Sequence, residues 1–151
     1  MQTIELIAAT EADFEALSAL RIRAMQASLE RIGRFDPQRA RDRLRASYDP
    51  AATRHIVVDG KQRVGFVAVN PVDAGLMLDH LYLDLAHHGH GIGSKVLKQI
   101  FNEVDQLGLS LQVGVLRQSE ANLFYLKHGF IYSHETEWDI YYVRPPQHKL
   151  E

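Results

Sequence analysis

The sequence predicts an α/β fold of the α+β kind, and two observations support this prediction. An apolar strand over residues 78–85 runs into a glycine-rich turn that opens an amphipathic helix. Further upstream, an Asp-Gly pair joins two apolar runs, which is typical of an antiparallel hairpin. With 151 residues, 46% of them hydrophobic, the chain has the size and apolar content of one ordinary domain. We therefore expect one domain over residues 1–149 and interpret residues 150–151 as a candidate tag remnant.

The composition argues against several classes of protein. A formal net charge of −2 is unlike the basic surplus that general nucleic-acid binding requires. The chain has no cysteine, so it has no disulfide, thiolate nucleophile or thiolate metal site. No early segment reads as a signal peptide, and no apolar run approaches the roughly 18 residues of a membrane span. We expect a cytoplasmic protein with neither nucleic acid nor membrane as a partner.

The chain should begin with a strand and a helix. Residues 3–8 alternate between apolar and polar side chains, as a half-buried strand does. Thr10 and Asp13 then resemble a capping box, which predicts a helix that runs to about Leu29. Its apolar face would consist of Phe14, Leu17, Leu20 and Ala24.

A second helix and a hairpin should follow. Asp36-Pro37 has the composition of an N-cap and first helical position, so a helix should run to about Ser47. Its arginines at 39, 41, 43 and 45 predict a solvated face; attraction of an acidic substrate or of nucleotide phosphates is the alternative. The Asp59-Gly60 turn should join strands at 55–59 and 63–69, and a loop over 70–75 leads onward.

Strands and helices should alternate from Leu78 to Phe130. Apolar residues recur at helical spacing after the glycine-rich turn until Gly108 ends that helix. The next strand covers 109–116, and a last strand covers 138–143. One face of this last strand would allow pairing across a homodimer, and that face consists of Trp138, Ile140 and Tyr142.

The glycine-rich turn, residues 88–94, suits a phosphate ligand. Its alternating glycines let the backbone approach a ligand, and the first N–H groups of the following helix point into the turn. A tight connection without a ligand is the alternative. A Walker loop is excluded because Ser94 separates Gly93 from Lys95. A dinucleotide fingerprint is a weak match, because its third glycine is missing and the next strand ends at Arg117 rather than at an acidic residue.

Two motifs resemble those of one enzyme family. The segment His88-x-x-Gly91-x-Gly93 resembles motif A of the GCN5-related N-acetyltransferases (GNAT), Arg/Gln-x-x-Gly-x-Gly/Ala, with histidine in the first position. The segment from Gln118 to Phe130 resembles motif B of the same family, with Gln118 in the usual asparagine place and Tyr125 in the usual tyrosine place. Both motifs occur in the family's order, with a strand between them.

This resemblance implies a fold and a cofactor. The fold would be a mixed, mainly antiparallel sheet with helices on both faces. The cofactor would be acetyl-CoA, whose phosphates meet the backbone amides of the glycine-rich turn and whose pantetheine arm pairs with the backbone of the central strand. The cofactor-binding residues would be Leu81, Leu83, His88, Gly89, His90, Gly91, Ile92, Gly93, Ser94, Gln118 and Tyr125.

The resemblance also implies catalytic roles. Tyr125 would give its proton to the departing thiolate, because a phenol pKa of about 10 lies near that of a thiol. The base would be a residue of the central strand, His80 or Asp79. Alternation places His80 beside Leu78 and Tyr82, and Asp79 on a more apolar face that we expect to be core, so His80 is preferred. A structural role remains open for both Tyr125 and His80.

Three histidines beside the glycine-rich turn, His87, His88 and His90, invite a metal interpretation. The turn offers no nearby carboxylate except Asp84, which is also the third candidate base, and a loop that wraps phosphates has little room for imidazoles around an ion. We therefore expect no specific metal site and place a partly charged His88 near the pyrophosphate.

The expected activity is acetyl-CoA-dependent transfer of an acetyl group to a primary amine, by direct attack in a ternary complex. A non-catalytic acyl-CoA-binding or regulatory module and a nucleotide-binding interaction domain are the alternatives. The acceptor would be a small-molecule amine or a peptide N-terminus. The resemblance implies that residues 25–35, Trp138 and Tyr141 line its pocket.

Overall fold

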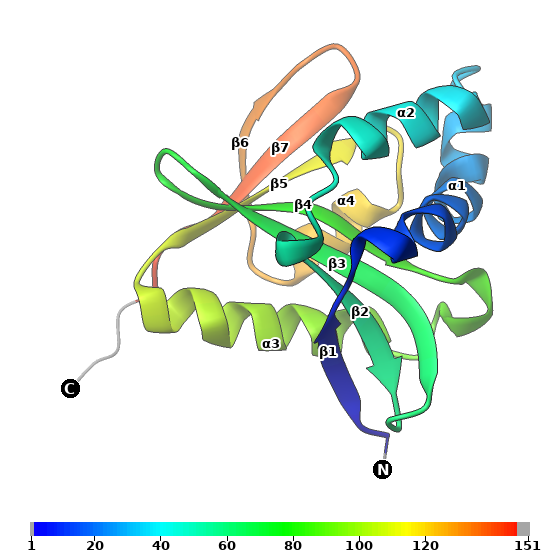
Figure 1. Ribbon diagram of the computed structural model, residues 1–151. Coiled ribbons are helices and arrows are strands. Elements are labelled where there is room, and N and C mark those ends of the chain that lie inside the picture. The colour runs from blue at the N-terminus through cyan, green and yellow to red at the C-terminus, as the bar shows by residue number, and fades with distance from the viewer. Residues whose placement is uncertain (1, 148–151) are drawn as a thin grey trace. The chain divides into compact units, whose positions relative to one another are not determined.

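The computed structural model describes residues 2–147, so the candidate tag remnant at 150–151 lies outside the described residues. Its strands form one sheet in the order β1-β2-β3-β4-β5-β7-β6, which confirms the mixed, mainly antiparallel fold (Figure 1). Within these residues no helix has the length and apolar character needed to cross a membrane. In chain order the elements are β1 (Ile4–Ala8), α1 (Phe14–Arg31), α2 (Pro37–Ser47), β2 (Thr53–Val58), β3 (Gln62–Val72), β4 (Gly75–Leu83), α3 (Ile92–Leu107), β5 (Ser110–Leu116), α4 (Ala121–Lys127), β6 (Ile131–Glu135) and β7 (Asp139–Arg144).

The chain divides into two compact units. The first contains the described residues up to Ala68 together with His80–Val96, and the second contains Val69–Asp79 together with the described residues from Leu97 onward. The strands β3 and β4 and the helix α3 each begin in one unit and end in the other. A single domain over residues 1–149 remains a prediction.

In the first unit, antiparallel pairs join β1 to β2 and β2 to β3, with a bulge between Ile56 and Val57. The helices α1 and α2 lie side by side (Figure 1). Asp36 begins α2 as predicted, because its carboxylate accepts a hydrogen bond from the Arg39 amide at 3.1 Å. The core between helix and sheet consists of Ala9, Leu17, Leu20 and Phe66, with Tyr48 and Tyr82 packed against it.

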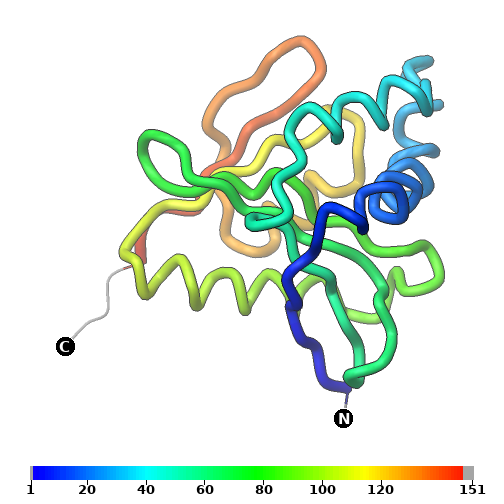
Figure 2. The backbone as a smooth tube through the Cα atoms, in the orientation of Figure 1, coloured from blue at the N-terminus to red at the C-terminus, as the bar shows by residue number. Residues whose placement is uncertain are grey.

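In the second unit, the start of β4 is parallel to β5, and β7 pairs with both β5 and β6. The β4–β5 ladder covers Gly75–Leu78, although β4 continues to Leu83. The backbones approach closely at Gly75, where a Cβ would lie 2.4 Å from the Ser110 hydroxyl oxygen, so only glycine fits there. The β6–β7 hairpin is the orange-to-red segment of the tube in Figure 2.

Three expectations about the elements need correction. The loop expected at 70–75 is shorter, because β3 continues to Val72. The strand β6 was not predicted, because all five of its residues are exposed and it shows no apolar alternation. The last strand, β7, is not an edge, since β5 and β6 flank it and Tyr142 is only 4% exposed. Strand β7 therefore offers no free edge for pairing across a homodimer. The homodimer itself remains a prediction.

Candidate active site

The second half of β4 presents His80 and Tyr82 to an aromatic cluster in the first unit. The ring centroid of the fully buried Phe66 lies 5.9 Å from that of His80 and 5.6 Å from that of Tyr82. Leu81 on the alternate face is half-buried, and Asp79 is exposed. The expectation that the Asp79 face is the core was therefore wrong, because the His80 face is the one packed on Phe66.

This environment keeps the His80 imidazole neutral. Burial, with a smaller contribution from the positive charge of Arg21, lowers the pKa of His80 from 6.5 to about 4. Its Nδ1 atom is buried and has no hydrogen-bond partner within residues 2–147. The expectation of a histidine that titrates near neutral pH does not hold in these surroundings.

The helix α1 of the first unit carries two further polar residues with buried atoms, Ser18 and Arg21. The Arg21 guanidinium lies over the Tyr82 ring at 5.8 Å, and its Nη1 donates a hydrogen bond to the Ala40 carbonyl at 3.0 Å. The Arg21 Nε and the Ser18 hydroxyl are buried without a partner among the described residues. Neither residue was singled out from the sequence, although Arg21 falls four residues after Leu17, inside the apolar face of the helix, where a cation is unusual.

The glycine-rich turn has the geometry of a phosphate site. Gly89 and Gly91 have φ angles of 78° and 74°, which favour glycine, and a Cβ on either would meet no atom within 4 Å. The turn opens α3, a helix of 16 residues, and the first N–H groups of a helix have no acceptor inside the helix. An open backbone followed by a helix N-terminus fits the phosphates of coenzyme A.

The His88 side chain fixes this turn to the end of β4. Its Nε2 lies 2.9 Å from the Leu83 carbonyl oxygen, and because a carbonyl only accepts, Nε2 carries the proton and donates. The imidazole therefore links the turn to the last residue of β4. Within residues 2–147, no group of three or more His, Cys, Asp or Glu side chains is arranged to hold a metal ion.

The two aspartates near the candidate base already have partners. The Asp79 carboxylate, in the second unit, accepts a hydrogen bond from the Asn70 side-chain amide at 2.5 Å. The Asp84 carboxylate, in the first unit, forms an ion pair with Arg23 at 3.1 Å and caps the Leu85 amide. Both are engaged in local contacts.

Tyr125 lies on α4 in the second unit and is 6% exposed. Its ring packs edge-on against Phe124 and Phe130, with centroids 5.1 and 5.3 Å away. Its carbonyl accepts the amides of His128 and Phe130, so the turn after α4 closes tightly. Gln118, by contrast, is exposed in the turn after β5.

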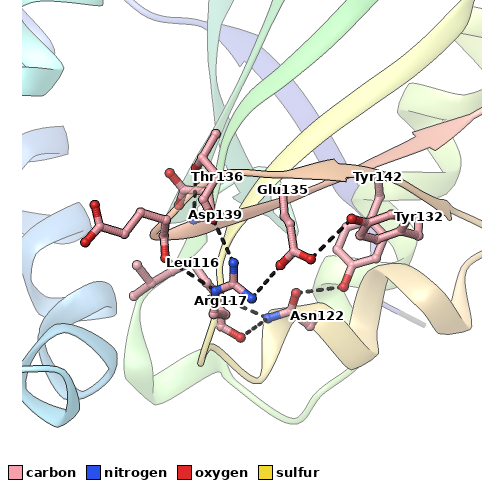
Figure 3. A network of polar contacts seen from close by, with 9 residues as sticks. Leu116, Arg117, Asn122, Tyr132, Glu135, Thr136, Asp139 and Tyr142 are labelled. Carbon is pink, nitrogen blue, oxygen red and sulfur yellow. Dashed lines mark hydrogen bonds and ion pairs between the residues drawn. The ribbon is translucent and has the colours of Figure 1, made fainter.

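A polar network holds α4 in place (Figure 3). The Asn122 side-chain amide donates to the carbonyls of Leu116 and Arg117 at 3.0 and 3.2 Å, and its oxygen accepts from the Tyr142 hydroxyl at 2.8 Å. Arg117 pairs with Glu135 on β6. The network joins the end of β5, α4 and the β6–β7 hairpin within the second unit. It was not predicted from the sequence, because no local pattern marks contacts between residues so far apart in the chain.

Known proteins share this fold. The family model described as an acetyltransferase (GNAT) domain matches residues 51–132. The PaiA N-acetyltransferase of Thermoplasma acidophilum, solved with coenzyme A, has a TM-score of 0.76 and 18% identity over 95% of this chain and 99% of that chain. An acetyltransferase of Thermus thermophilus has a TM-score of 0.71 and 22% identity, over 95% of this chain and 97% of that chain.

A third similar structure is the ribosomal-protein-S18-alanine N-acetyltransferase of Escherichia coli. Its TM-score is 0.69 at 19% identity, over 100% of this chain and 97% of that chain. No curated protein matched the sequence. At these identities the solved structures show a shared fold, while the family model covers more than half of the chain. The chain belongs to the GNAT acetyltransferase family.

Proposed function

We propose that this protein is an acetyl-CoA-dependent N-acetyltransferase that acetylates a primary amine by direct attack in a ternary complex. The observation that supports it most is the turn at Gly89 and Gly91, with its two left-handed glycines and open Cβ positions at the start of α3. Family membership supports acetyl transfer in general. The absence of cysteine removes a cysteinyl acyl-enzyme as an intermediate.

Bound acetyl-CoA would supply an acetyl group activated as a thioester. The amides from Gly89 to Ser94 would hold its phosphates, and each charge near the helix N-terminus would gain about 0.3–1 kcal/mol from the helix dipole. The backbone at Leu81 and Leu83 would pair with the pantetheine arm, because β4 continues past the end of its ladder with β5. His88 would keep the turn in its open shape through the Leu83 carbonyl, and Gln118 would add a side-chain contact.

His80 is our proposed base and Tyr125 our proposed acid. A neutral imidazole can accept the amine proton, but a group with a pKa of about 4 does so only as acylation makes that proton acidic. Asp79 is the less favoured base, because its carboxylate already accepts from Asn70. Tyr125 would donate its phenolic proton to the thiolate.

The weak basicity of His80 is also the observation that favours the second candidate function, a non-catalytic acyl-CoA-binding or regulatory module. Such a module would need the glycine-rich turn but neither a base nor an acid. The acceptor in the first function would be a small-molecule amine or a peptide N-terminus. A cytoplasmic location, expected from the sequence, remains a prediction.

Calorimetric titration with acetyl-CoA, with NAD and ATP as controls, tests the cofactor site first. Micromolar binding of acetyl-CoA alone supports it, and a preference for NAD or ATP contradicts it. Thiol release with a panel of primary amines then tests catalysis. Tyr125→Phe should lower turnover by about a hundredfold while leaving acetyl-CoA affinity within a few-fold. The matched control is Tyr132→Phe, at an exposed tyrosine of the same unit. Binding without any turnover would favour the regulatory module.

A further inference from the structure

Three buried polar atoms of the first unit have no partner among the described residues. They are the Ser18 Oγ, the Arg21 Nε and the His80 Nδ1, and each lacks a hydrogen bond within residues 2–147. Ser18 and Arg21 are three residues apart on α1, so they share a face of the helix. The Tyr82 ring on β4 lies next to both Arg21 and His80, 5.8 Å from the Arg21 guanidinium and 5.7 Å from the His80 ring. Buried polar groups are paired in nearly all folded proteins, so these atoms need partners, water or ligand, that the described residues do not supply.

The Arg21 guanidinium is fixed but leaves its binding edge unused. Its Nη1 donates to the Ala40 carbonyl, and the central carbon of the guanidinium lies over the Tyr82 ring. The Nε and Nη2 atoms form the opposite edge, which can hold a carboxylate through two parallel hydrogen bonds. No described residue makes a hydrogen bond to the buried Nε atom of that edge. The contrast with neighbouring arginines is direct, since Arg23, Arg41, Arg45 and Arg63 each pair with an aspartate or a glutamate.

Water alone would complete this cluster poorly. A water molecule can satisfy the Ser18 hydroxyl and the His80 nitrogen. It cannot neutralise the charge of a half-buried guanidinium, and an unpaired buried charge is far more costly than an unpaired neutral group. The missing partner should therefore be an anion with oxygen acceptors.

We propose that the amine acceptor also carries a carboxylate, so that the substrate class is amino acids, with the carboxylate bound by Arg21 and Ser18 and the amine directed to His80. This inference rests on the proposed acetyl transfer. It narrows the acceptor from any primary amine to amines with an anionic group.

The same arrangement accounts for a base that is weak in the free protein. The positive charge of Arg21 contributes to the lowered pKa of His80. A carboxylate on Arg21 would cancel that charge, so the imidazole would become a better proton acceptor when the correct substrate is bound. An amine without a carboxylate would leave the pKa of His80 low.

A binding experiment tests the inference independently of catalysis. The probes are N-acetylated amino acids with small, aliphatic, aromatic and acidic side chains, each beside its carboxamide, titrated into the protein in the presence of coenzyme A. We expect at least one carboxylate to bind about ten- to a hundredfold more tightly than its carboxamide. Arg21→Met should abolish this preference. Arg21→Lys should retain only part of it, since lysine keeps the charge but lacks the fork.

Two further variants keep the inference testable if the Arg21→Met protein fails to fold. Ser18→Ala, a small change, should weaken carboxylate binding several-fold, and Arg45→Gln, at an exposed arginine paired with Glu11, should change nothing. Equal affinity for carboxylates and carboxamides in the wild type, or a preference that survives Arg21→Met, would overturn the inference.

Thiol-release assays separate this inference from the proposed function. Turnover of decarboxylated amines with the same kcat/KM as the parent amino acids would overturn the carboxylate inference and leave acetyl transfer intact. Arg21-dependent binding of carboxylates without any thiol release would instead contradict the catalytic proposal.

Discussion

Two polar clusters of the first unit each place a strand histidine near α1, and they differ in whether their polar groups are paired. In the first, the Nε2 of His55 lies 2.9 Å from an Asp13 carboxylate oxygen, and the other oxygen lies 3.4 Å from Arg63. The Thr10 amide also donates to Asp13, at 2.9 Å. In the second, Ser18, Arg21 and His80 each leave one buried polar atom unpaired.

The difference separates a structural cluster from a binding cluster. The Asp13 carboxylate meets its donors inside the chain, so the fold itself completes the first cluster, and its contacts contribute to stability. The second cluster is fixed by Tyr82 and by the Ala40 carbonyl but stays incomplete. Mutations should therefore act on stability in the first cluster and on substrate binding in the second.

The largest effect on stability should come from Asp13→Ala. This change leaves His55, whose side chain is 4% exposed, without its carboxylate partner, and it removes the acceptor of the Thr10 amide. We expect a loss of about 2 kcal/mol in the free energy of unfolding at pH 7. Urea unfolding measures it, and Asp42→Ala on the exposed side of α2 is the control. A loss under about 0.5 kcal/mol would show that the first cluster is not structural.

The same cluster predicts how stability responds to acid. Hydrogen bonding from His55 and Thr10 lowers the pKa of Asp13 from 3.8 to about 2. Because the folded pKa lies below the unfolded one, this contribution is complete above about pH 4 and disappears as the pH falls toward 2. Asp13→Ala should therefore differ less from the wild type at pH 2.5 than at pH 7.

A smaller effect, in a different pH window, should come from His80. Its folded pKa of about 4 lies below its ordinary value of 6.5, so between these values the unfolded chain binds a proton that the folded chain does not. Stability should fall as the pH drops from about 6.5 to 4, by about 1–2 kcal/mol, because the half-buried ring remains partly screened by solvent.

Urea unfolding at pH 7.5 and at pH 4.5 checks this, with His80→Gln and His80→Phe compared with the wild type. Both variants should lose less stability between the two pH values than the wild type does. An identical loss in all three proteins would mean that His80 is protonated in the folded state and that its surroundings are wetter than the packing on Phe66 indicates.

The contrast between the clusters also explains what the sequence could predict. The helix from Pro37 to Ser47 was found because its start and end depend on neighbours in the chain, above all on the Asp36 cap. The glycine-rich turn was found for the same reason, since left-handed φ angles at Gly89 and Gly91 need glycine itself. Local chemistry determines both features, so a single sequence is enough to find them.

Only one residue of the second cluster, His80, was predicted from the sequence. His80 was singled out from its strand, but the core was assigned to the wrong face, because the leucines of β4 outnumber the aromatic residues that pack on Phe66. Arg21 could not be predicted because its role depends on tertiary contacts with Tyr82 on β4 and Ala40 on α2, and no local pattern marks Ser18. A cation within the apolar face of α1 was the one available sign.

The smallest effect on stability should come from Arg21→Met, which is also the sharpest test of the comparison. Removing the guanidinium loses the hydrogen bond to the Ala40 carbonyl, worth about 1 kcal/mol, and relieves an unpaired half-buried charge of similar or larger cost. The methionine keeps most of the apolar contact with Tyr82. These terms oppose each other, so the free energy of unfolding should stay within about 1 kcal/mol of the wild type. A loss as large as that of Asp13→Ala would show that Arg21 holds α1 to α2, and the second cluster would then be structural like the first.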